Sequence, residues 1–184
     1  MKNFFLFIWE TVKIFVIAAV IVVPIRYFLF QPFIVRGESM EPNFHTGDYL
    51  IIDEISYRIR DPQRGEVIVF KYPNNPVHRY IKRVIGLPGE SVEIKEGKIS
   101  ITKAGSTKIL DESAYFAEQV LTSGNYTFSL GENEYLVLGD NRAASSDSRA
   151  WGLLPEKYII GRAFFRAWPV SVLAKIPTPF YQAQ

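Results

Sequence analysis

The 184-residue sequence contains no cysteine, only two histidines and no dense cluster of lysine and arginine. Without cysteine the chain has no disulfide, no cysteine nucleophile and no cysteine-ligated zinc site. A histidine-centred mechanism can draw only on His45 and His78. The formal net charge of +2 is too small to indicate a nucleic-acid partner. The chain also lacks a nucleotide-binding glycine loop, and we expect neither a cofactor nor a metal.

Hydrophobic residues are plentiful, at 48% of the chain, and they are concentrated near the N-terminus. From Thr11 to Phe30 the only charges are Lys13 and Arg26, near the two ends, where long side chains can reach lipid headgroups. About 20 helical residues at ~1.5 Å each match the ~30 Å hydrocarbon core of a bilayer. The pattern predicts a transmembrane helix over residues 11–30, preceded by a short N-terminus, residues 1–10.

Two other interpretations of this run are a cleaved signal peptide and a buried core helix. The first is disfavoured because large residues follow the run, and no small-x-small cleavage pattern precedes Gln31-Pro32. Positive charges stand on both sides of the run, so their distribution does not decide which end is cytoplasmic.

Residues 31–184 consist of short apolar runs separated by glycine-, proline- and asparagine-rich turns, which predicts an all-β domain of short antiparallel strands. The expected strands are 33–35, 49–52, 67–70, 78–85, 92–94, 99–101, 126–130 and 135–138, with a closing strand pair over 158–168. Alternation on both sides of Glu96-Gly97 indicates a hairpin. Over residues 102–124 the periodicity fades, and we expect a variable, flexible excursion there. The fold class is therefore mainly β, behind one N-terminal helix.

Two residues suggest chemistry. Ser39, in Ser39-Met40-Glu41-Pro42, lies just beyond the predicted membrane exit, and Lys82 is a lone lysine within an apolar run. A serine and a nearby lysine can act as nucleophile and base. Each also has a structural interpretation, because Ser-x-x-Pro is common in turns and a lysine often marks an exposed edge strand.

Four stretches, in this order, resemble bacterial signal peptidase I. They are 39–42, 47–50, 64–70 together with 80–90, and 139–152, and the resemblance extends from the N-terminal helix to the ending at 165–169. It implies a membrane-bound serine endopeptidase that removes signal peptides from exported preproteins by cutting after small residues at −1 and −3. It also implies a cytoplasmic N-terminus, a single pass through the cell membrane, and an extracytoplasmic peptidase domain over 31–184. The expected partners are signal peptides and the lipid bilayer.

The resemblance makes Ser39 the nucleophile and Lys82 the general base. A lysine accepts a proton only when it is neutral, and a free lysine titrates near ~10.4. Burial among apolar side chains lowers that value, and Tyr80 and Ile81 on one side with Val84 and Ile85 on the other provide such surroundings. We therefore expect the pKa of Lys82 to be depressed to ~8.

Further roles also come from the resemblance. Ser145 matches a serine that holds and orients the lysine, and Asp147 and Arg149 match a charged pair that supports the site. The chain departs from some members at Gly37, where a serine would help to stabilise the oxyanion. The backbone N–H of Ser39 is then the natural donor.

An extended substrate is expected to pair as a strand between residues 33–35 and 78–81. Ile34, Tyr80 and Ile81 are the candidate residues for shallow apolar pockets that accept small side chains. Each of them is equally consistent with an ordinary position in a β-core.

Three alternatives stay open from the sequence. One is a histidine triad using His45 or His78 with Asp48 or Asp53, although no nucleophile-elbow motif is present. Another is a self-cleaving repressor with the same Ser/Lys pair, which would need a DNA-binding region in place of the apolar run. The last is a membrane-anchored β-domain that binds or scaffolds a partner without catalysis.

Overall fold

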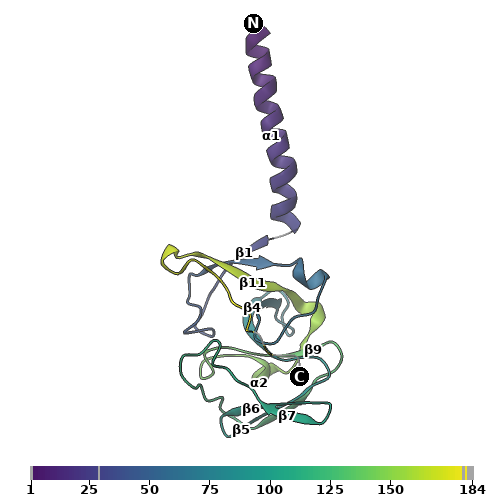
Figure 1. The fold of residues 1–184 in the computed structure, drawn as a ribbon, viewed down its shortest axis with the longest axis vertical. Coiled ribbons are helices and arrows are strands. Elements are labelled where there is room, and N and C mark those ends of the chain that lie inside the picture. The colour runs from purple at the N-terminus through teal and green to yellow at the C-terminus, as the bar shows by residue number, and fades with distance from the viewer. Residues whose placement is uncertain (1, 29, 180, 182–184) are drawn as a thin grey trace.

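A computed structural model of the chain describes residues 2–28, 30–179 and 181. It consists of a long helix, α1 (Lys2–Phe28), that projects from one end of a β-rich body (Figure 1). The strands are β1 (Phe30–Ile34), β2 (Tyr49–Asp53), β3 (Val67–Lys71), β4 (Arg79–Gly86), β5 (Ser91–Lys95), β6 (Lys98–Lys103), β7 (Ser106–Ile109), β8 (Tyr126–Ser129), β9 (Glu134–Leu138), β10 (Leu154–Pro155), β11 (Ile159–Trp168) and β12 (Ala174–Lys175). A short helix, α2 (Ser148–Trp151), and three 3₁₀ turns, η1 (Ser56–Arg58), η2 (Glu156–Tyr158) and η3 (Val170–Val172), complete the fold. The prediction of a mainly β protein is confirmed.

The N-terminal helix is longer than the predicted span and stands clear of the β body in Figure 1. Its described apolar side chains, among them Phe7, Phe15 and Val20, are exposed. In the part of the chain that the structure describes, no helix meets both the length and the apolar character needed to cross a membrane. Residue 29, within the predicted span of 11–30, lies outside the described residues. The transmembrane assignment stays a prediction.

The strands form two sheets. The larger sheet has the order β1-β2-β11-β3-β4-β9-β10, with β12 also paired to β11, and the smaller has the order β7-β6-β5-β8. All of these pairings are antiparallel. In Figure 1 the smaller sheet lies at the end of the body away from α1.

Most of the expected strands are found, and the hairpin between β5 and β6 is confirmed. Its turn requires positive φ at both central residues, and these are Glu96 at φ 51° and Gly97 at φ 78°. The expected closing pair over 158–168 is wrong, because Tyr158 ends the 3₁₀ turn η2 and the remaining residues form one long strand, β11. Bulges interrupt the register of β11 against β2 and β3, which disturbs the period-two alternation that marks a continuous strand.

The segment expected as a flexible excursion, 102–124, is partly regular. It contains the end of β6 and the whole of β7, and the loop that follows buries Phe116 and Thr122. β7 therefore pairs with β6, and the loop that follows is anchored in the body by these two buried side chains.

Strand β4 lies in the middle of the larger sheet, between β3 and β9, and both of its faces are covered. Ile81, Val84 and Ile85 each belong to a different apolar cluster of the core. Lys82 on this strand is only 4% exposed, which excludes the interpretation of Lys82 as a solvated surface lysine.

Candidate active site

Lys82 projects from β4 toward the turn that carries Ser39. Its side chain is 4% exposed, and its Nζ donates hydrogen bonds to Ser39 Oγ at 2.6 Å and to the carbonyl oxygen of Ile81 at 2.9 Å. Burial lowers the pKa of Lys82 from 10.5 to about 8, while the charges of Asp147 and Asp140 act in the opposite direction. The expected depression of this pKa agrees with the structure, and desolvation is its cause.

Ser39 lies in a loop whose ends are tied together and whose apolar residues are in the core. The loop is closed where the N–H of Val35 bonds to Asp48 O at 2.9 Å and the N–H of Gly47 bonds to Val35 O at 3.0 Å. Met40 is fully buried and Phe44 nearly so, both in the apolar cluster around Ile81. The core thus anchors the loop and fixes the position of Ser39 opposite Lys82.

A second loop, residues 139–149, packs against the Ser39 loop. The backbone N–H of Asn141 donates to Ser39 O at 3.1 Å, and its side-chain amide donates to Glu38 O at 3.2 Å. A Cβ on Gly139 would lie 2.1 Å from Ser145 Oγ and 2.4 Å from Ser39 O, which no real side chain allows. Glycine at this position is what lets the two loops approach each other so closely.

Asp147 and Arg149 form the charged pair expected from the sequence. The guanidinium donates to both carboxylate oxygens, at 2.9 and 2.8 Å, and the N–H of Gly139 donates to Asp147 Oδ2 at 3.0 Å. Burial raises the pKa of Asp147, but these hydrogen bonds and the Arg149 charge outweigh it, so the pKa lies below its usual range. Asp147 is therefore an anionic support beneath the second loop.

Ser145 lies beside Gly139, between the second loop and the Ser39 backbone. Its hydroxyl is buried and, among the residues described, makes no hydrogen bond of ordinary geometry, although it lies close enough to Asp147 to help lower the pKa of that carboxyl. The two bonds of Lys82 Nζ go to Ser39 and Ile81, so the expected contact of Ser145 with the lysine is not formed in this state.

A groove of about 580 Å³ runs past Ser39 and Lys82. Its walls contain all three candidate pocket residues, of which Ile34 is 50% exposed, Tyr80 is half-buried and Ile81 is buried. The complete lining is Pro32, Phe33, Ile34, Arg36, Gly37, Glu38, Ser39, Arg79, Tyr80, Ile81, Lys82, Ala144 and Ser146.

Two strand edges border this groove. β1 is the terminal strand of the larger sheet, and β4 pairs with β9 only from Arg83 onward. Within the described chain, the stretch of β4 from Arg79 to Lys82 consequently has a strand neighbour on one side only. The groove therefore offers backbone hydrogen-bonding groups to an extended peptide.

The histidine triad is not assembled. His45 and His78 are exposed, and neither is among the residues that line the groove. Asp48 lies 3.3 Å from the Arg166 guanidinium and Asp53 pairs with Arg162 at 2.9 Å, so both carboxylates are engaged elsewhere. In the described residues, no group of three or more His, Asp or Glu side chains is arranged to hold a metal ion.

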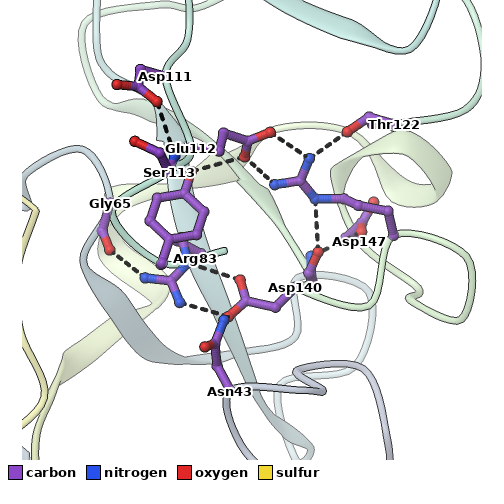
Figure 2. Close-up of polar contacts among 12 residues, drawn as sticks. Asn43, Gly65, Arg83, Asp111, Glu112, Ser113, Thr122, Asp140 and Asp147 are labelled. Atoms are coloured by element: carbon purple, nitrogen blue, oxygen red, sulfur yellow. Dashed lines mark hydrogen bonds and ion pairs between the residues drawn. The ribbon is translucent and has the colours of Figure 1, made fainter. Parts of the chain in front are cut away.

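A cluster of buried charges lies behind the site and is drawn in Figure 2. The sequence does not predict this cluster. Arg83 pairs with Asp140 through two hydrogen bonds of 2.8 and 2.6 Å, and Arg142 pairs with Glu112. Strand alternation does indicate that Arg83 points away from Lys82. No local pattern marks Glu112, which lies in the segment where periodicity fades.

Comparison with known proteins shows the family of the chain. The family model described as "Signal peptidase, peptidase S26" matches residues 8–168. The chain is 40% identical over 166 residues to "Probable signal peptidase I-2" of Synechocystis sp., which covers 88% of this chain and 73% of that protein. It is 36% identical over 173 residues to "Signal peptidase I" of Bacillus licheniformis, covering 91% and 92%. A solved signal peptidase I from Enterococcus faecalis V583 is 33% identical, with a TM-score of 0.45, covering 56% of this chain and 97% of that one.

Proposed function

Because this chain belongs to the signal peptidase family, peptidase S26, we propose that it is a membrane-anchored serine endopeptidase that removes N-terminal signal peptides from exported preproteins. The observation that carries the proposal is the 2.6 Å hydrogen bond between Lys82 Nζ and Ser39 Oγ, made where burial brings the lysine pKa to about 8. A non-catalytic scaffold has no need for a desolvated lysine on a serine hydroxyl.

In the proposed reaction, neutral Lys82 accepts the hydroxyl proton as Ser39 Oγ attacks the carbonyl carbon of the scissile peptide bond. The resulting ammonium then donates that proton to the departing amine, the C–N bond breaks, and an ester joins the signal peptide to Ser39. Neutral Lys82 next accepts a proton from water, which attacks the ester carbonyl. Collapse of the second intermediate returns the proton to Ser39 Oγ and releases the signal peptide.

The oxyanion of each tetrahedral intermediate needs hydrogen-bond donors. Gly37 offers no hydroxyl, and both of its backbone groups bond to the Thr46 hydroxyl at 3.0 Å. The N–H of Ser39, by contrast, has no acceptor within the described residues. This supports the Ser39 N–H as the oxyanion donor.

The substrate would bind as an added strand between β1 and the free edge of β4. Ile34, Tyr80 and Ile81 would then form the shallow pockets for the side chains at −1 and −3. Because Tyr80 and Ile81 are held by packing within β4, the pockets cannot enlarge easily, which favours small residues such as alanine.

The proposed arrangement places residues 1–10 in the cytoplasm, the helical part of the predicted span 11–30 across the bilayer, and the β body outside. The predicted end of the span is corrected by the structure, because α1 ends at Phe28 and Phe30 already belongs to β1, where it pairs with Asp53 of β2. The arrangement is supported by the projection of α1 from the body and by its exposed apolar side chains. The groove begins at β1, the strand that follows α1, so a substrate emerging from the bilayer would meet it directly.

The proposal is tested with purified full-length protein in detergent and a preprotein carrying Ala-x-Ala before the cleavage site. We expect a single cut after the second alanine, identified by mass spectrometry, and little or no cut when either alanine is replaced by phenylalanine. The protein itself should stay with the membrane fraction through an alkaline carbonate wash. Binding of the preprotein without any cleavage would instead indicate a non-catalytic binding module.

Ser145 is proposed to orient Lys82 during proton transfer, with Asp147 and Arg149 holding its loop in place. The hydroxyl is buried and makes no hydrogen bond of ordinary geometry in the described chain, so its oxygen can accept a hydrogen bond from the ammonium form of the lysine. Ser145→Ala should lower kcat by ~10²-fold, the size expected for disturbed general-base catalysis. The control is Ser146→Ala, since Ser146 is exposed and merely lines the groove. Equal rates for the two variants would remove Ser145 from the mechanism.

A further inference from the structure

The loop from Asp111 to Thr122, here named the clamp loop, packs against the buried charges behind the site. Figure 2 shows Glu112 and Thr122 on one side of this cluster and Arg83, Asp140 and Asn43 on the other. The clamp loop is far in sequence from both Ser39 and Lys82, and it lines no part of the groove past them.

Arg142 is the residue through which the clamp loop reaches the site. Its side chain is 2% exposed, and its guanidinium bonds to both carboxylate oxygens of Glu112 and to the hydroxyl of Thr122. Among the described residues, Glu112 is its only ion-pair partner. A buried arginine needs such a counter-charge to stay in place, so the position of Arg142 depends on the clamp loop.

Arg142 also holds the start of the second loop, through its guanidinium and its backbone carbonyl. Its Nε donates to the carbonyl oxygen of Gly139 at 3.0 Å, and its own carbonyl accepts from Arg149 Nη2 at 2.8 Å. Gly139 is the residue that has no space for a Cβ between Ser145 and Ser39. A small movement of Arg142 would therefore be passed directly to the backbone that positions Ser145.

A second contact links the clamp loop to the lysine strand. The ring of Tyr115 lies 4.0 Å from Arg83 Cζ, and its hydroxyl donates to Glu112 Oε1 at 2.8 Å. Arg83 in turn holds Asp140 through a bidentate pair that is buried on both sides. Glu112 is thus bonded both to the arginine that fixes Gly139 and to the tyrosine that covers the arginine beside Lys82.

From these contacts we propose that Glu112 is a positioning residue for catalysis, which acts through Arg142 to hold the Gly139–Ser145 loop against the nucleophile. The inference rests on the proposed function, since it assigns a role within that reaction. Glu112 touches no substrate, so its effect falls on the geometry of proton transfer and not on peptide binding.

The test compares Glu112→Gln with Glu118→Gln in the preprotein cleavage assay. Both changes replace one carboxylate by an amide within the same loop, but Glu118 is exposed and bonds to none of these residues. We expect Glu112→Gln to lower kcat by roughly 10- to 100-fold with KM changed less than about twofold, as a small misplacement of catalytic groups does. Glu118→Gln should match the wild type in both constants.

Two further variants make the outcome decisive. If Glu112 acts through Arg142, the double variant Glu112→Gln/Arg142→Gln should lose no more kcat than Arg142→Gln alone, because the second change removes an interaction already lost. Thr122→Val keeps the shape of a fully buried side chain while removing one acceptor of Arg142, and should lower kcat by roughly three- to tenfold. If Glu112→Gln does not fold, Thr122→Val provides the test of the inference.

A wild-type kcat in folded Glu112→Gln, or in Thr122→Val if the first variant is unfolded, overturns the inference. So does a rise in KM at constant kcat, which would place the effect on peptide binding. If the wild-type protein cleaves no preprotein, the proposed function fails instead, and the two failures are told apart by this reference reaction.

Discussion

Replacing Ser39 with alanine is expected to abolish preprotein cleavage, with kcat reduced by at least ~10⁴-fold, as when the nucleophile of a serine protease is removed. No other hydroxyl in the described structure accepts a hydrogen bond from Lys82. The backbone of residue 39 would keep its bond from Asn141, and Met40 would still anchor the loop. The variant should therefore fold and melt like the wild type, which circular dichroism checks beside the cleavage assay.

The matched control for this loss is a double variant, His45→Gln/His78→Gln. Both histidines are exposed and lie outside the groove lining, so their removal should leave most of the activity. A loss comparable to that of Ser39→Ala would restore the triad hypothesis. Turnover at the wild-type rate in Ser39→Ala would show that the nucleophile is another residue.

Lys82→Met is expected to lower kcat by at least ~10³-fold, because methionine retains much of the apolar stem but cannot accept a proton. In the wild type, kcat/KM should rise with pH and level off above about 8, where the buried lysine becomes neutral. At pH 7 about one molecule in ten would have the neutral base. A pH–rate limb near 10 instead would mean that an exposed lysine, or another group, takes the proton.

The same burial makes the charged lysine costly to the folded state. At ~1.4 kcal/mol per pKa unit, the difference between 10.5 and about 8 corresponds to about 3 kcal/mol of lost stability when Lys82 is charged in both states. Between these two pH values the unfolded chain binds more protons than the folded one, so the free energy of unfolding rises with pH. Below pH 8 the charged lysine lowers the free energy of unfolding by the full amount, and above pH 10.5 this loss of stability is absent.

Lys82→Met removes this penalty at every pH. Below pH 8 the variant should be more stable than the wild type by up to about 3 kcal/mol, and the gap should close as the pH rises from 8 toward 10.5. Chemical denaturation of both proteins across this range measures the gap. A gap that stays constant with pH, or clear cleavage by Lys82→Met, would contradict the assignment of Lys82 as the base.

Several features were determined by the sequence alone because they depend on local periodicity and turn chemistry. Alternating apolar residues around Glu96-Gly97 predicted the hairpin that β5 and β6 form. The order of the motifs around Ser39 and Lys82 predicts both as site residues through the family resemblance, and the structure places them within hydrogen-bond distance of each other. The sequence does not predict β7, because all four of its residues are exposed and no apolar alternation marks the strand. The sequence predicts two strands where β11 forms one, because bulges in β11 break its alternation.

Only the tertiary structure decided what surrounds these residues. Ser39 and Lys82 are 43 positions apart, and they meet because the core holds the Ser39 loop over the covered middle strand of the sheet. The apolar residues that flank Lys82 in sequence favour a depressed pKa, but the burial that lowers it comes from distant segments packed over β4. Glu112 lies in a segment without periodicity, and its proposed role depends on a buried arginine 30 positions away. Spacing along the chain carries information about strands and turns, whereas charge pairing and desolvation depend on which parts of the folded chain come together.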